Sequence, residues 1–281
     1  MLTFLPHPIK GFLSILLYTI NTIVLTTPLI FFSFFKFIVP VKPFVIILDK
    51  ILISIATLWI GINSFNSKLF CKIEWDIKGL EKLEKNQWYL VLSNHQSWVD
   101  IFALQTTLNR KIPMLKFFLK QELIWIPFLG LAWWALDFPF MKRYSKTQIE
   151  AKPHLKGKDL KSTKKACEKF KHTPVSVINF VEGTRFTPGK KALQKNNTFV
   201  YLLNPKAGGI AFILGSMGKY LNKIIDVTIV YPGEIPTFWE YISGRVNKII
   251  IDFQTIEMTD SLMGDYFNDP EYKAFFFFLS Q

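Results

Sequence analysis

The first seventy residues are dominated by apolar positions with few interruptions. Between Gly11 and Phe35, 25 consecutive residues carry no charge, which as a helix would extend ~37 Å, against a hydrocarbon core of ~30 Å. A second uncharged stretch, from Ile51 to Ser67, has only 17 residues and ends in the polar letters INSFNS. The pattern predicts two apolar helices that contact a membrane.

Two arrangements of these apolar stretches fit the pattern. Both helices could cross the bilayer, or they could form a hairpin that dips into one leaflet with its lysines among the headgroups. We favour the one-leaflet hairpin, because the second stretch is short for a span. A cleaved signal peptide would have a shorter apolar region and a cleavage site, whereas this run continues into FKFIVPVKPF.

From about Cys71 onward, short apolar runs that stop at polar residues are separated by helix-like stretches. Such runs are typical of buried strands. Strands are predicted in residues 71–80, Trp88–Asn94, Val175–Gly183, Ile224–Pro232 and Lys248–Ile256. Helices are predicted around Ile101–Leu108, Leu160–Lys171 and Gly209–Tyr220.

This alternation predicts an α/β fold in which a mostly parallel central sheet is flanked by helices. An N-terminal membrane-embedded helical hairpin precedes the sheet. We place the membrane-associated region at residues 1–67 and the α/β domain at residues 68–281. In such sheets, functional sites lie where strand ends meet loops.

Composition adds a strongly basic balance to the apolar pattern. The chain has 34 Lys plus Arg against 21 Asp plus Glu, a net charge of +13, and 28 of its residues are Phe. Excess positive charge favours nucleic acid or an anionic membrane surface as a partner. Cys71 and Cys167 form no metal-ligand pattern, so we predict neither a disulfide framework nor a metal site, and a domain that faces the cytosol.

The sharpest local feature is NHQSWVD at the end of the Trp88–Asn94 strand, where His95 and Asp100 lie five residues apart. An imidazole can accept a proton from an alcohol near neutral pH if a carboxylate orients the ring and stabilises the imidazolium. The competing interpretation is a capping or surface histidine beside a solvated acid. The strand-end position favours the dyad, and no G-x-S-x-G, P-loop or dinucleotide motif competes with it.

A second candidate site is FVEGTR at the end of the Val175–Gly183 strand. Its glycine lets the backbone turn, so that Glu182 and Arg185 face one cleft. From Arg185 to Lys206 the chain carries five positive charges and no acid. Arg185 could bind a phosphate with two hydrogen bonds.

Two further segments each fit more than one structural interpretation. Residues 140–171 hold 11 Lys plus Arg against three acids, which fits either a functional basic surface or a solvated basic helix and loop. Just before them, residues 123–141 are apolar and rich in tryptophan, which suits a core or a bilayer interface. We favour the core over the bilayer interface for most of this stretch, and a groove lined by it could still receive an acyl chain and lead it toward His95.

The segments NHQSWVD, VEGTR and LLNPKAGG together resemble the 1-acylglycerol-3-phosphate acyltransferase family of glycerolipid acyltransferases, over about Trp88–Pro232. WWALDFPFMKRYSK is most similar to the bacterial inner-membrane branch akin to lysocardiolipin-type and long-chain acyltransferases. The resemblance implies that His95 is the general base and that Asp100 orients it. It implies an acyl thioester, acyl-CoA or acyl-carrier protein, as co-substrate, and no cofactor, metal or covalent acyl-enzyme.

The resemblance also implies an acceptor site. Arg143 of FMKR is the expected phosphate contact, assisted by the VEGTR element, and VTIVYPG matches a fourth motif near the acyl donor. Val181 departs from the proline that many members carry, which removes a rigid turn but no chemical group. The implied acceptor residues are Arg143, Glu182, Gly183, Thr184 and Arg185, with Asn94, Lys142, Lys191 and Pro232 as possible auxiliaries.

The implied activity is transfer of a fatty acyl group to the sn-2 hydroxyl of lysophosphatidic acid, or of a related lysophospholipid such as lysocardiolipin. The expected location is the bacterial inner membrane, with the catalytic domain facing the cytoplasm and no nucleic-acid partner. A lipid thioesterase or hydrolase is the nearer alternative. A membrane-anchored nucleic-acid-binding protein is the more remote one.

Overall fold

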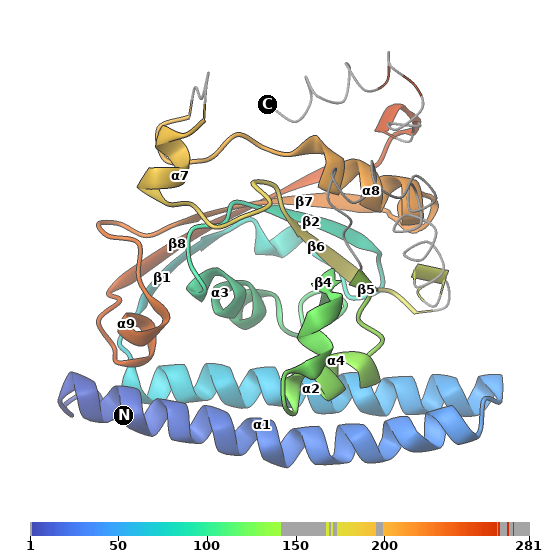
Figure 1. Cartoon of the computed structure of the whole chain (residues 1–281), viewed down its shortest axis with the longest axis horizontal. Coiled ribbons are helices and arrows are strands. Elements are labelled where there is room, and N and C mark those ends of the chain that lie inside the picture. The colour runs from blue at the N-terminus through green and yellow to red at the C-terminus, as the bar shows by residue number, and fades with distance from the viewer. Residues whose placement is uncertain are drawn as a thin grey trace, which may run out of the picture.

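The chain folds into an α/β domain that rests on a layer of two long helices (Figure 1). The computed structural model describes residues 2–141, 167, 168, 170, 173–194, 199–262, 264, 269 and 272. Helix α1 spans His7–Ile38 and helix α2 spans Lys42–Phe70. Both are long and apolar enough to cross a membrane.

The two helices are held side by side by a seam of polar side chains. The Asn21 side-chain amide donates to the side-chain oxygen Oδ1 of Asn63 at 2.7 Å, and the Tyr18 hydroxyl lies 2.8 Å from the Ser67 hydroxyl. Pro40 lies in the short connection between the helices, where a proline prevents the first helix from continuing. The predicted helix pair is confirmed, but α2 begins nine residues before Ile51, because Asp49 is accommodated by an ion pair with Lys36 at 2.6 Å.

The main sheet has six strands in the order β1-β8-β7-β2-β6-β3. Their bounds are β1 Glu74–Lys78, β2 Tyr89–Ser93, β3 Leu115–Phe117, β6 Ser176–Phe180, β7 Lys223–Val230 and β8 Lys248–Glu257. All neighbours are parallel except β7 and β8, which form an antiparallel pair. The prediction of a mostly parallel sheet is therefore confirmed, and each segment predicted as a strand contains one.

Helices cover both faces of this sheet (Figure 1). On the face toward the helix layer, α3 (Val99–Leu108) buries Val99, Ala103 and Leu104 against the strands. On the opposite face, α8 (Ala207–Met217) buries Ile210, Ile213 and other apolar side chains. Short helices α7 (Pro188–Ala192) and α9 (Phe238–Ile242) follow strands β6 and β7.

The tryptophan-rich stretch divides between core and surface. It forms the 3-10 helix η2 (Gln121–Trp125) and helix α4 (Leu129–Ala135), next to the small sheet of β4 (Leu119–Lys120) and β5 (Phe140–Met141). Ala132 and Ala135 pack in a cluster with Leu29 of α1 and Leu52 of α2, whereas Trp125 is 85% exposed. Most of the predicted Leu160–Lys171 helix lies outside the described residues.

Candidate active site

The candidate site lies at the edge of the sheet where parallel strands β7, β2 and β6 end side by side. The loop Asn94–Trp98 leaves β2 there and leads into α3, and the loop after β6 runs beside it. The Phe186 N–H donates to the His95 carbonyl at 2.7 Å, which ties the two loops together. The carboxyl ends of parallel strands are the usual place for a site in such a sheet.

His95 and Asp100 form the predicted pair. His95 Nδ1 lies 2.9 Å from Asp100 Oδ2, and the Asp100 side chain is fully buried in the first turn of α3. The same carboxylate oxygen accepts the N–H groups of Gln96 at 2.7 Å and Ser97 at 2.9 Å. With Nδ1 bound to the carboxylate, Nε2 is the nitrogen left to act on a substrate.

A third residue, Tyr231, completes this pair, and sequence reasoning missed it. Its hydroxyl donates to Asp100 Oδ1 at 2.6 Å, so both carboxylate oxygens are occupied. Burial and the adjacent Asp100 carboxylate raise the pKa of Tyr231 well above its ordinary value, so it acts as a neutral donor. Tyr231 directly follows β7, a parallel neighbour of β2, and this position is the signal that could have found it.

The His95 ring is also fixed from one face. The Phe180 ring at the end of β6 stacks on it, with centroids 3.9 Å apart and planes 13° from parallel. The hydrogen bond to the Asp100 carboxylate fixes which way Nδ1 points, and stacking on Phe180 fixes the plane of the imidazole ring. The imidazole is therefore held in one orientation before a substrate arrives.

Glu182 supports the His95 loop from inside the protein. Its Oε1 accepts the His95 N–H at 2.8 Å, its Oε2 accepts the Leu203 N–H at 2.9 Å, and the side chain is 1% exposed. Burial raises the pKa of Glu182, and these two hydrogen bonds oppose that rise. Both oxygens are thus directed at backbone groups, so any contribution of Glu182 to acceptor binding acts through the position of the loops.

Gly183 allows the tight turn after Glu182. Its φ is +66°, and a Cβ at this position would meet the Lys206 side chain at 3.0 Å. Residues other than glycine rarely adopt such a φ. This turn separates the buried Glu182 from the exposed Arg185 three residues later.

Arg185 and Thr184 lie on the outside of this turn. The Arg185 guanidinium sits over the Trp98 ring, 4.5 Å from its centroid, and Trp98 is itself 53% exposed. Thr184 Oγ1 accepts a hydrogen bond from Lys190 Nζ at 2.7 Å. The His95 loop thus presents an aromatic platform for a cation of the neighbouring loop.

The predicted auxiliary residues have different surroundings. Asn94 is buried and pairs with the backbone of Ile229 through both its amide nitrogen and its oxygen, each at 2.8 Å. Lys191 donates to the Phe199 carbonyl, and Pro232 is exposed next to Tyr231. Lys142 and Arg143 lie outside the described residues.

Four backbone N–H groups at the start of α3 already have partners inside the protein, so these four are not free to stabilise an oxyanion. The N–H groups of His95, Gln96 and Ser97 are bound to the Glu182 and Asp100 carboxylates. The Val99 N–H donates to Ser97 Oγ at 3.1 Å. The buried carboxylates use these donors to fix the loop.

The fold and the site together define an α/β protein in which a buried carboxylate orients a histidine at the edge of the sheet. Within the part of the chain that the structure describes, no three His, Cys, Asp or Glu side chains gather as a metal site, and the absence of a metal from the protein stays a prediction. The Acyltransferase family model matches residues 74–231, more than half of the chain. The protein therefore belongs to the Acyltransferase family.

Similar proteins include two curated mouse enzymes. Lysocardiolipin acyltransferase 1 of Mus musculus is 29% identical over 161 residues, which cover 52% of this chain and 40% of the relative. 1-Acyl-sn-glycerol-3-phosphate acyltransferase epsilon of Mus musculus is 25% identical over 202 residues, 64% of this chain and 52% of the relative. The chain thus matches about half the length of these relatives.

The crystal structure of the 1-acyl-sn-glycerophosphate (LPA) acyltransferase PlsC from Thermotoga maritima has a similar fold. The TM-score is 0.50, the sequence identity is 16%, and the match covers 96% of this chain and 94% of that one. The match therefore extends over the two N-terminal helices as well as the sheet.

Proposed function

We propose that the protein is a membrane-associated acyltransferase that moves a fatty acyl group from a thioester to the sn-2 hydroxyl of lysophosphatidic acid or a related lysophospholipid. The observation that carries this proposal is the His95–Asp100 pair, in which a buried carboxylate holds Nδ1 at 2.9 Å and leaves Nε2 free. The names of the relatives that share this region point to lysophospholipid acceptors, including lysophosphatidic acid and lysocardiolipin.

The proposed acyl transfer uses a single general base, His95. His95 Nε2 removes the proton from the acceptor hydroxyl as its oxygen bonds to the thioester carbonyl carbon. Asp100 stabilises the imidazolium through Nδ1–H. The tetrahedral intermediate then breaks its carbon–sulfur bond, and the proton on Nε2 passes to the leaving thiolate, which gives an ester and a free thiol. No acyl-enzyme forms, because the lipid hydroxyl itself is the nucleophile.

Cationic side chains beside the pair suit a phosphate-bearing acceptor. Arg185 is exposed on the Trp98 ring and Lys190 lies next to it on α7. A guanidinium can bind a phosphate with two hydrogen bonds. Arg143 remains part of this proposal as a further phosphate contact, and either acyl-CoA or acyl-carrier protein could supply the acyl group.

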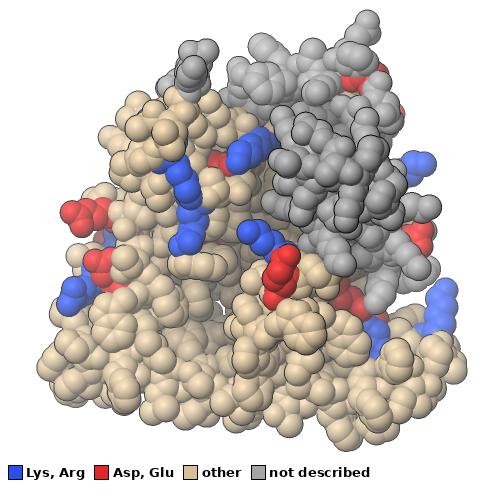
Figure 2. Space-filling view, in the orientation of Figure 1, with Lys and Arg blue, Asp and Glu red and all other residues tan. Residues whose placement is uncertain are grey.

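We further propose that α1 and α2 lie in one leaflet. The domain contacts α1 at both ends, through Trp239 on Gly11 and through Asp137 on Lys36, positions ~37 Å apart along a helix. If α1 crossed the ~30 Å hydrocarbon core, the charged domain would lie inside the bilayer. In Figure 2 the band formed by the two helices is nearly free of charge on the face shown.

This arrangement brings the active site to the bilayer surface, where both the acceptor and the product reside. The expected membrane is the bacterial inner membrane, with the domain on the cytoplasmic side, where thioester donors are dissolved. Outward-facing side chains of the helices are apolar, among them Phe12, Phe31, Phe34 and Phe65. Such a face binds in the interfacial region of a leaflet.

Product analysis tests the proposed reaction. Detergent-solubilised protein is supplied with labelled acyl-CoA or acyl-carrier protein and with lysophosphatidic acid, lysocardiolipin or another lysophospholipid, beside His95→Ala. We expect labelled diacyl product from the wild type alone. Labelled free fatty acid without a new lipid ester would instead identify a hydrolase, and turnover that survives His95→Ala would exclude this site.

A further inference from the structure

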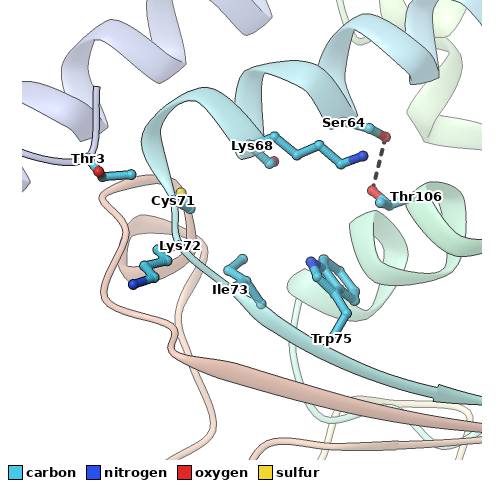
Figure 3. Close-up of a pocket in the computed structure, with 9 residues that line it drawn as sticks. Thr3, Ser64, Lys68, Cys71, Lys72, Ile73, Trp75 and Thr106 are labelled. Carbon is cyan, nitrogen blue, oxygen red and sulfur yellow. Dashed lines mark hydrogen bonds between the residues drawn. The ribbon is translucent and has the colours of Figure 1, made fainter. Parts of the chain in front are cut away.

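A cavity of about 440 Å³ lies away from the His95 loop, between the end of α2, the start of β1 and α3. Figure 3 shows Ser64 and Lys68 reaching it from α2, Trp75 from β1 and Thr106 from α3. Thr106 is near the far end of α3 from Asp100. The cavity is therefore separate from the catalytic pair, although the same helix reaches both.

Three nitrogen donors line this cavity, from two lysines and a tryptophan. Lys68 and Lys72 are exposed, and neither has an ion-pair partner among the described residues. The Trp75 indole nitrogen faces the space between α2 and β1 (Figure 3) and has no hydrogen-bond partner within the described part of the chain. Because no carboxylate lines the cavity, its charge favours an anion.

The hydroxyls that line the cavity are already ordered by the protein. Ser64 Oγ lies 3.1 Å from Thr106 Oγ1, and Ser67 Oγ lies 2.7 Å from the Tyr241 hydroxyl. Ile73 and the Trp75 ring supply an apolar wall. An anionic head on an apolar body fits such a lining better than a small soluble ion does.

The cavity also adjoins the apolar face of the helix layer. Phe65, one turn before Lys68 on α2, is 65% exposed, and Ile62 is 40% exposed. With the helices lying in a leaflet, these side chains contact acyl chains while Lys68 and Lys72 reach the level of the headgroups. A lipid of that leaflet can therefore place its phosphate in the cavity without leaving the bilayer.

We infer that this cavity binds the headgroup of an anionic glycerophospholipid, at a site distinct from the acceptor site. The inference rests on the proposed membrane association. The bound lipid is a fixed ligand that holds the end of α2 and the start of β1 against the leaflet. It is not consumed in the reaction.

The test is flotation of the full-length protein with vesicles of phosphatidylcholine alone or with a minority of phosphatidylglycerol. We expect the double variant Lys68→Ala/Lys72→Ala to lose about thirtyfold of the preference for phosphatidylglycerol, equivalent to ~1 kcal/mol for each lysine. The matched control Lys82→Ala/Lys85→Ala removes the same charge from exposed positions after β1 and should keep the preference. Thr106→Leu keeps every charge but fills the cavity, and should also reduce the preference.

Three results would overturn the inference. The first is an equal effect of the two double variants, which would show non-specific attraction. The second is an unchanged preference in Thr106→Leu. The third is loss of the preference when soluble glycerol 3-phosphate is added, which would show a site for free phosphate. Failure of the wild type to float even with phosphatidylcholine would instead overturn membrane association itself.

Discussion

At the scale of single residues, the candidate site is a pair of buried acids that hold one partly buried histidine. Asp100 receives four hydrogen-bond contacts, from His95, Tyr231 and two backbone N–H groups, and Glu182 receives two backbone N–H groups. Each of these acids would be costly to bury without such partners. Both acids bind backbone N–H groups of the His95 loop and hold it in place, and the proposed reaction uses the remaining ring nitrogen of His95.

The Tyr231 hydroxyl should contribute to catalysis through Asp100. Tyr231→Phe removes one donor to a buried carboxylate, a contact worth ~1.5–3 kcal/mol. We expect kcat to fall at least about tenfold with little change in KM, because Tyr231 orients the base without touching substrate. Steady-state kinetics with lysophosphatidic acid checks this. An unchanged kcat would show that Asp100 is held adequately by the backbone alone.

Glu182 should give the protein a stability that depends on pH. Burial raises its pKa above the ordinary value of 4.5, so the folded protein binds this proton more tightly than the unfolded chain does. The resulting stabilisation is present below about pH 4.5 and is lost as the pH rises through the folded pKa. Glu182→Gln should abolish this trend, while Glu81→Gln at an exposed position should keep it.

Denaturant unfolding of the three proteins from acid to neutral pH measures the effect. At neutral pH, Glu182→Gln should also cost ~1–3 kcal/mol, because the amide nitrogen faces a backbone N–H that then has no acceptor. A wild type and Glu182→Gln that differ by the same free energy at every pH would contradict the account.

The residues of the site differ in how far the sequence could reveal them. His95 and Asp100 were predictable because they lie only five residues apart at a strand end, His95 on the loop after β2 and Asp100 in the first turn of α3. Tyr231 is 131 residues from Asp100, and only the β2–β7 register brings them together. The inward direction of Glu182 was not predictable, because its partner N–H groups belong to two other loops.

At the scale of elements, the ends of the strands determine where the loops lie, and the loops determine where the residues of the candidate site lie. Parallel pairing of β2 with β6 aligns Ser93 with Phe180, so the residues that follow each strand meet. Periodicity predicted these strands well, since each is a short apolar run between polar residues. It could not predict that β7 and β8 pair antiparallel, because the same run of apolar residues fits either direction.

The turn after β6 should depend on Gly183. Gly183→Ala forces alanine to φ +66° beside Lys206, which costs ~1–2 kcal/mol and shifts Arg185. We expect a lower melting temperature and a higher KM for lysophosphatidic acid. The control Gly189→Ala, where a Cβ would meet nothing within 4 Å, should leave both unchanged. Equal behaviour of the two variants would argue against a strained turn.

At the scale of the whole molecule, the domain packs along a layer of two long apolar helices (Figure 1), and we propose that this layer faces one leaflet. The sequence predicted both apolar helices, but charge counting could not decide between a span and a one-leaflet hairpin. The proposal of a one-leaflet hairpin rests on contacts between residues distant in sequence, such as Trp239 on Gly11. Those contacts show that the domain lies along the helices. The length of an apolar stretch in the sequence does not reveal this position.

The one-leaflet arrangement predicts the side on which the helix connection lies. Cys71 and Cys167 are buried, so a cysteine introduced as Val41→Cys can be labelled selectively with a membrane-impermeant maleimide. In oriented membrane vesicles, we expect Val41→Cys to be labelled from the same side as Lys85→Cys on the domain. Labelling from opposite sides would mean that the helices cross the bilayer.

The central claim is that a histidine held by a buried carboxylate deprotonates the hydroxyl of a membrane lipid, which then accepts an acyl group from a thioester. The most direct measurement is the initial rate of transfer from labelled acyl-CoA to lysophosphatidic acid in vesicles, for the wild type, His95→Gln and Asp100→Asn. Both variants keep the approximate size of the side chain, and each should lower kcat by about 10³-fold or more, with the labelled acyl group of the wild type found in phosphatidic acid. Turnover that persists in His95→Gln would contradict the account.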